Sequence, residues 1–286
     1  MVRSPLLSLF VRSSLITATL VGALSCRLMG AGEERGADEI MKAAWESAAT
    51  FFPNESLLGF GELGGGLEEG PREARFGYAV ALLSANPATR EQLDLAESIF
   101  LSLAESGDDE LGLGSRFLLG RIHQIYRSPM EPEEAARHFQ LLIDEHPESR
   151  WAQMSLVKLG LLIVYSLPDA GAPAERLAAA GELLAKATGR DARRDLHLLM
   201  ASAHFHYKLE DTGALPHLVA AEEEGVLDIG SRADVLVRIG ELYVLAGQPG
   251  NAVPYYRRFV SEYYGDQRRY AVQKKIEAIT GEEETD

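Results

Sequence analysis

The 286-residue chain has a single cysteine, Cys26, so it can form no internal disulfide bond and its stability depends on packing. Basic residues are also few, since 28 Lys and Arg stand against 43 Asp and Glu, and the formal net charge is −15. A surface of this charge repels nucleic acid and anionic lipid headgroups. We therefore expect no nucleic-acid partner. The charge either keeps the chain soluble or matches a basic partner.

Motifs for catalysis and metal binding are missing as well. The triple glycine at 64–66 is not followed by Gly-Lys-Ser/Thr, so it is no phosphate-binding loop. The sequence contains neither Gly-x-Ser-x-Gly nor His-Glu-x-x-His. His197 and His204 share a helix face, but His206 lies about 200° round the helix from His204 and cannot join them. We expect no metal, no cofactor and no enzymatic activity; an enzyme with an unrecognised site is a remaining alternative.

Residues 1–25 have the layout of a secretory signal peptide. Arg3 and Arg12 supply positive charge, a short apolar segment runs from Leu15 to Leu24, and polar sequence starts at Glu33. The apolar segment is about ten residues long, roughly half of what a membrane-spanning helix needs. This length favours a cleaved signal over an uncleaved anchor.

The end of this segment, Ala23-Leu24-Ser25-Cys26, resembles the lipoprotein box of bacterial envelope proteins. The resemblance implies that Cys26 becomes a lipid-modified N-terminus that attaches the chain to a membrane, facing the periplasm. Stable attachment needs two or more lipid chains, because one chain gives only marginal binding. The alternative is ordinary cleavage after Ala23 or Ser25, which would give a soluble periplasmic or secreted protein.

The clearest structural pattern is at residues 231–265, where two amphipathic helices are separated by a turn. Apolar and small residues at helical spacing define the inner face of a first helix, namely Leu236, Ile239, Gly240 and Tyr243. Gly247, Pro249 and Gly250 break it. A second helix then carries Ala252, Tyr256 and Phe259 on its inner face. Gly240 and Ala252 are small where the two helices must approach each other closely.

This spacing resembles the tetratricopeptide repeat, with its large-x2-Leu-Gly-x2-Tyr and Ala-x3-aromatic positions. Weaker copies precede it: Ala96 with Phe100, Gly120 with Phe139, Gly160 with Ala180, and Ser202 with Leu218. The small residues of the first helices, Gly120, Gly160, Ser202 and Gly240, recur about every 40 residues, whereas the standard repeat has about 34. One repeat cannot bury its own apolar face, so an array is expected.

The resemblance implies an all-α fold, a right-handed helical-repeat solenoid of about five helix pairs. We divide the chain into a signal peptide (1–25), a lipidated N-terminus with one helix and a glycine-rich linker (26–71), the solenoid (72–265), and a capping helix with an acidic tail (266–286). Within the linker, residues 58–71 are expected to form a flexible loop. In the cap, Tyr270, Val272 and Ile276 are expected to cover the end of the stack.

By the same resemblance, ligands bind the concave surface that the first helix of each pair lines. The residues of this chain at the inward positions include Arg121, Gln124, Tyr165, His206, Tyr207 and Glu241. The function expected is a non-enzymatic protein-binding scaffold of the bacterial cell envelope, with a protein or peptide partner. The alternative is a structural or regulatory superhelical module in cell-wall remodelling, similar to the helical scaffold of lytic transglycosylases.

Overall fold

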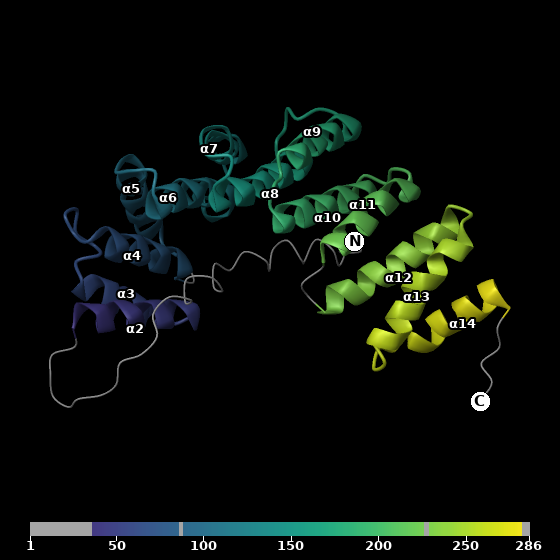
Figure 1. The fold of residues 1–286 in the computed structure, drawn as a ribbon. Coiled ribbons are helices and arrows are strands. Elements are labelled where there is room, and N and C mark those ends of the chain that lie inside the picture. Colours follow the sequence, from purple (N-terminus) through teal and green to yellow (C-terminus); the bar gives the residue numbers. More distant parts are fainter. Residues whose placement is uncertain (1–35, 86–87, 226–228, 282–286) are drawn as a thin grey trace. The chain divides into compact units, whose positions relative to one another are not determined.

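The computed structural model describes residues 36–85, 88–225 and 229–281, and these segments contain helices and no strand. The all-α prediction is therefore confirmed for the described chain, while the signal peptide and Cys26 lie outside it. The α-helices are α2 (Ala37–Ala49), α3 (Pro53–Glu62), α4 (Arg72–Ser84), α5 (Arg90–Glu105), α6 (Glu110–Arg121), α7 (Pro132–Glu145), α8 (Arg150–Tyr165), α9 (Pro173–Ala185), α10 (Arg190–His206), α11 (Leu215–Glu224), α12 (Ile229–Leu245), α13 (Pro249–Glu262) and α14 (Arg269–Thr280). Figure 1 labels these α-helices along the chain. A π-helix, η1 (Ile122–Tyr126), continues α6, and a 3-10 helix, η2 (Asp211–Ala214), precedes α11.

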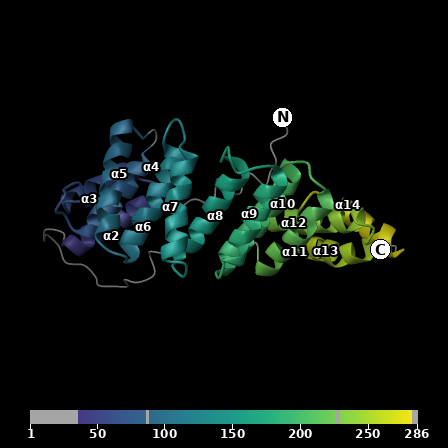
Figure 2. The same ribbon diagram turned by 90° about the horizontal axis from the view of Figure 1, so that it is seen from above.

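The chain forms two compact units, and the boundary falls inside α8, between Ser155 and Leu156. In the N-terminal unit each helix from α2 to α7 packs against the next one along the chain. In the C-terminal unit the same holds from α9 to α14, and Figure 2 gives the second view of these helices. Packing between sequence neighbours is the organisation that a helical-repeat solenoid requires. Among the described helices, none is both long and apolar enough to cross a membrane.

Local sequence signals explain where the helices begin. Proline occupies the first turn of α3, α7, α9 and α13, where its missing N–H is not needed for a helical hydrogen bond. Thr89 caps α5 through a capping box with Gln92. The side chain of Asp109 accepts a hydrogen bond from the backbone N–H of Gly112 and so caps α6.

The predicted helix pair at 231–265 is confirmed as α12 and α13. Ala252, Tyr256 and Phe259 are buried, and a Cβ atom added to Gly240 would lie only 2.2 Å from Cε1 of Tyr256. The pair α6 and α7 repeats this contact, because a Cβ on Gly120 would lie 2.6 Å from Phe139. A small residue on the first helix thus receives an aromatic ring from the second.

Two expectations, one for the glycine-rich linker and one for the capping helix, are wrong. Residues 58–62 are not loop but the second half of α3, which packs between α2 and α4. Phe60 is fully buried there, and two glycines permit close packing: Gly59 of α3 lies against Ala44 of α2, and Gly77 of α4 lies under the Phe60 ring. In α14, Val272 and Ile276 are buried as predicted, but Tyr270 is 72% exposed and does not cover the stack.

Candidate functional site

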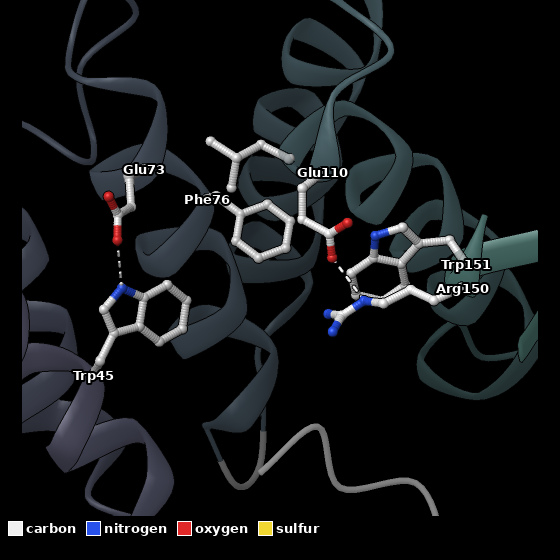
Figure 3. A pocket seen from close by; sticks show the side chains of 7 residues that line it. Trp45, Glu73, Phe76, Glu110, Arg150 and Trp151 are labelled. Carbon is white, nitrogen blue, oxygen red and sulfur yellow. Dashed lines mark hydrogen bonds and ion pairs between the residues drawn. The ribbon is translucent and has the colours of Figure 1, made fainter. Parts of the chain in front are cut away.

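A pocket of about 190 Å³ lies in the N-terminal unit, where the first turns of α4, α6 and α8 face α2. Figure 3 shows the side chains that line it, which are Trp45, Glu73, Phe76, Glu110, Leu111, Arg150 and Trp151. Four helices therefore contribute, and α4, α6 and α8 are each the first helix of a pair. The chain contains two tryptophans, and both line this pocket.

The aromatic walls of the pocket continue into the hydrophobic core. Trp45 packs edge-on against Phe60 with ring centroids 4.9 Å apart, and it faces Phe76 at 6.4 Å. On the opposite wall Trp151 packs against Phe117 with centroids 5.3 Å apart. Phe76 and Trp151 are buried, whereas Trp45 is half-buried. The walls are therefore apolar surfaces that the hydrophobic core supports from behind.

Charged groups surround the aromatic rings at the mouth. Nε1 of Trp45 donates a hydrogen bond to Oε1 of Glu73 at 3.2 Å, and Nε of Arg150 lies 2.6 Å from Oε1 of Glu110, as the dashed lines of Figure 3 mark. The guanidinium carbon of Arg150 lies 4.5 Å from the centroid of the Trp151 ring. The lining thus contains two carboxylates and one guanidinium, and the Trp151 face of the pocket already carries a cation.

One polar atom in the wall has no partner. Nε1 of Trp151 is buried and makes no hydrogen bond with any described residue. The indole lies against the backbone of α6, because a Cβ on Gly114 would be 2.9 Å from Cζ2 of Trp151. A buried donor without an acceptor costs about 1–3 kcal/mol. This donor, the aromatic faces and the carboxylates suit a ligand with a hydrogen-bond acceptor and positive charge.

The predicted concave-surface residues fall in both units and do not line this pocket. In the N-terminal unit, Arg121 and Gln124 are buried and bonded to each other, and burial lowers the pKa of Arg121. In the C-terminal unit, Tyr165 and His206 make an edge-on contact at 5.0 Å, and His206 contacts Tyr207 at 4.8 Å. The structure therefore brings three of the predicted residues together.

The hydroxyl of Tyr207 in this aromatic cluster donates a hydrogen bond to the carbonyl of Val164. The hydroxyl of Tyr165 is buried without a partner in the described chain, and burial raises its pKa. Glu241 is not bonded to this aromatic cluster. Its carboxylate pairs with Lys275 at 2.8 Å and with Arg238 at 3.6 Å. Ligand binding by these residues stays a prediction.

Two groups of histidines belong to different units. In the C-terminal unit Nδ1 of His197 lies 3.0 Å from Nδ1 of His217, while the His204 ring is 6.2 Å from the His217 ring. In the N-terminal unit one ligand atom from each of His123, Glu134 and His138 lies within 4.8 Å of the other two. The second group has the composition of a metal site.

Sequence reasoning overlooked the pocket, although one signal for it was visible. In the sequence, Trp45 lies beside the apolar face of a predicted helix. Trp151 follows Arg150, and no motif surrounds it. Tryptophan and arginine are the residues most enriched at energetic centres of protein interfaces. The rarity of tryptophan in this chain, two residues in 286, was the available hint.

Comparison with known proteins supports the repeat assignment. A family profile for the tetratricopeptide repeat matches residues 234–263, which run from within α12, through the turn, to the residue that follows α13. A search of curated proteins finds no match to the chain. The matched segment contains the Gly240–Tyr256 contact that joins the two helices. The chain therefore contains a tetratricopeptide repeat in its C-terminal unit, and the part of the chain that the structure describes is all-helical.

Proposed function

We propose that this protein is a non-enzymatic scaffold that binds a protein partner, and that the Trp45–Trp151 pocket receives one side chain of that partner. Tetratricopeptide repeats generally mediate binding between proteins, which supports the class of function. The observation that carries the proposal is the pocket itself, with both tryptophans and a buried unpaired donor in its wall. Its volume of about 190 Å³ is below the roughly 300–1,000 Å³ of small-molecule sites.

The side chain that suits the pocket best is a basic one. Glu73 and Glu110 outnumber Arg150 at the mouth, and the chain as a whole carries a formal charge of −15. Arg150 stacks over Trp151 and so provides an internal example of a cation on this aromatic surface. An arginine or lysine from an extended segment would lie against the pocket-lining faces of Trp45 and Phe76, and a backbone carbonyl beside it would accept a hydrogen bond from Trp151 Nε1 once Arg150 moves aside.

Tryptophan fluorescence tests this proposal directly, because both tryptophans line the pocket. The full chain is titrated with synthetic peptides that carry Arg, Lys or Glu at a central position. We expect saturable emission changes with the basic peptides, weakening as salt is added. Glu73→Gln should weaken binding about tenfold, whereas Glu68→Gln, a carboxylate outside the pocket lining, should not. Equal responses to acidic and basic peptides, or none to either, would refute the proposal.

We also propose that Cys26 anchors the protein by lipid in a bacterial cell envelope. The signal-like segment and the resemblance to a lipoprotein box support this address. Fractionation of cells that produce the Cys26→Ala variant tests it: the variant should leave the membrane fraction while the parent stays there. A variant that remains membrane-bound would exclude the lipid anchor. Sedimentation with purified peptidoglycan would favour the alternative role in cell-wall remodelling.

A further inference from the structure

The second candidate site lies between η1 and α7 in the N-terminal unit. Glu134 and His138 are four residues apart on α7, so both project from one face of that helix, and Nε2 of His138 lies 3.5 Å from Oε1 of Glu134. The ring of His123 on η1 lies opposite, with its centroid 5.4 Å from that of His138. One ligand atom of each residue lies within 4.8 Å of the others.

These separations are close to those of a bound transition-metal ion. Zinc binds imidazole nitrogen at about 2.0–2.1 Å and carboxylate oxygen at about 2.0–2.2 Å in tetrahedral geometry, which places ligand atoms about 3.4 Å apart. The His138–Glu134 pair already has this spacing. The remaining atoms need to approach by up to about 1.4 Å, a movement that rotation of side chains can supply.

The surroundings of His123 resemble those of a metal-bound imidazole. Nδ1 of His123 lies 2.6 Å from Oε2 of Glu131, and the backbone N–H of Glu131 donates to the carbonyl of His123 at 3.0 Å. A carboxylate on one ring nitrogen fixes the tautomer and directs the other nitrogen to a metal. This bond leaves Nε2 as the coordinating atom of His123. Glu97, which Arg127 holds in place, lies 3.5 Å from this Nε2.

The backbone supplies an independent observation. η1 is a π-helix that continues directly from α6, and its last hydrogen bond runs from the N–H of Arg127 to the carbonyl of Ile122 at 3.0 Å. π-helical turns are rare and occur frequently at functional sites, and η1 is such a turn at the C-terminal end of α6. The extra residue in this turn changes the direction of the following side chains. His123 stands on that turn.

Burial and charge also suit a divalent cation. The side chains of His123 and His138 are 9% and 12% exposed, while Glu134 is 40% exposed and gives access from solvent. Three carboxylates (Glu97, Glu131, Glu134) and two guanidiniums (Arg127, Arg137) surround the histidines. Arg137 now pairs with Glu134 and would have to release it; its side chain is 55% exposed and free to turn outward.

We propose that His123, Glu134 and His138 bind a divalent transition-metal ion, with Zn²⁺ as the ion that two imidazoles and one carboxylate favour. Glu131 positions His123 from behind. Three protein ligands leave a fourth position for water or for a side chain of a partner. The sequence predicted no metal, so this proposed site departs from that expectation.

Calorimetry with ZnCl₂ tests the proposal on the full chain, purified without a histidine tag and treated with a chelator. We expect one equivalent to bind. Glu134→Gln and His138→Asn should each weaken binding by more than 100-fold, and Glu131→Gln by about 10–100-fold. The matched control is Glu133→Gln, an exposed carboxylate beside Glu134 on the same helix, which should leave the affinity unchanged.

Glu134 is half-exposed, so its substitution should leave the fold intact, and the circular dichroism of each variant checks this. Cobalt(II) replaces zinc as a coloured probe, and its visible absorption should show tetrahedral nitrogen and oxygen ligation that disappears in His138→Asn. Absence of zinc binding would overturn the proposal. Binding that Glu134→Gln and His138→Asn leave unchanged would overturn it equally, because the metal would then be on other surface carboxylates.

Discussion

Replacing Gly240 with alanine tests the packing of the tetratricopeptide repeat with one methyl group. The added Cβ would lie 2.2, 2.6 and 2.7 Å from three atoms of the Tyr256 ring, where ordinary contact requires about 3.5–4.0 Å. The ring would have to retreat by more than about 1 Å. Tyr256 is 1% exposed, and it packs in one cluster with Val272 and Ile276 of α14. The ring has no solvent to move into.

Overpacking of this kind costs about 1–3 kcal/mol, and three clashing ring atoms place the cost near the upper end. Alanine in place of glycine inside a helix returns about 1 kcal/mol. We therefore expect a net destabilisation of about 2 kcal/mol, or a fall in Tm of about 4–8 °C for the C-terminal unit. Calorimetric melting of the full chain measures it.

The control is Gly250→Ala in α13, because a Cβ there would meet nothing within 4 Å. This variant should melt at the same temperature as the parent or slightly higher. Shortening the ring with Tyr256→Leu should reduce the cost of Gly240→Ala, giving a positive coupling in a double-mutant cycle. If Gly240→Ala alone melts as high as the parent, the close approach of α12 and α13 is not what joins the pair.

Two further predictions concern pH and capping. Asp109→Ala should cost about 1 kcal/mol in urea unfolding at pH 7, because it removes a helix cap and the ion pair with Arg72. The hydrogen bond from Arg72, and then the one from the Gly112 N–H, lower the pKa of Asp109 to about 2. The stability that Asp109 contributes is therefore complete above the ordinary pKa of 3.8 and is lost as pH falls toward 2. His217 has its pKa lowered to about 4, by burial first and then by His197 and His204. Stability should fall by about 1–2 kcal/mol as pH decreases from about 6.5 to 4, and His217→Gln should reduce this loss; an unchanged pH profile would contradict the assignment.

Helix pairing was predictable where the sequence marks both the turn and the contact between the two helices. Around Gly240 and Tyr256, periodicity marks the buried faces and the glycines mark the turn, so α12 and α13 follow from the sequence. α3 did not follow, because glycine weakens a helix and a glycine-rich segment suggests a loop. Gly59 and Gly77 instead make room for neighbouring side chains, and only the position of Phe60 in three dimensions reveals it.

The two candidate sites were harder to predict than the fold. The pocket joins Trp45 of α2 to Trp151 across more than a hundred residues, through the first turns of α4, α6 and α8, and no periodic pattern in the sequence indicates this junction. His123 and His138 meet because a π-helical turn breaks the regular 3.6-residue repeat after Arg121. A search for spaced ligand motifs assumes a regular helix and therefore passes over this pair.

Packing between chain neighbours has a consequence for how the protein folds. In each unit a helix contacts chiefly the helix that precedes or follows it, so the loops that must close are short. Folding of such chains is fast, because little loop entropy is lost before contacts form. Each hairpin of helices can also dock as soon as the ribosome has released it, without waiting for distant sequence. Assembly can thus proceed in the order of synthesis, one pair after another.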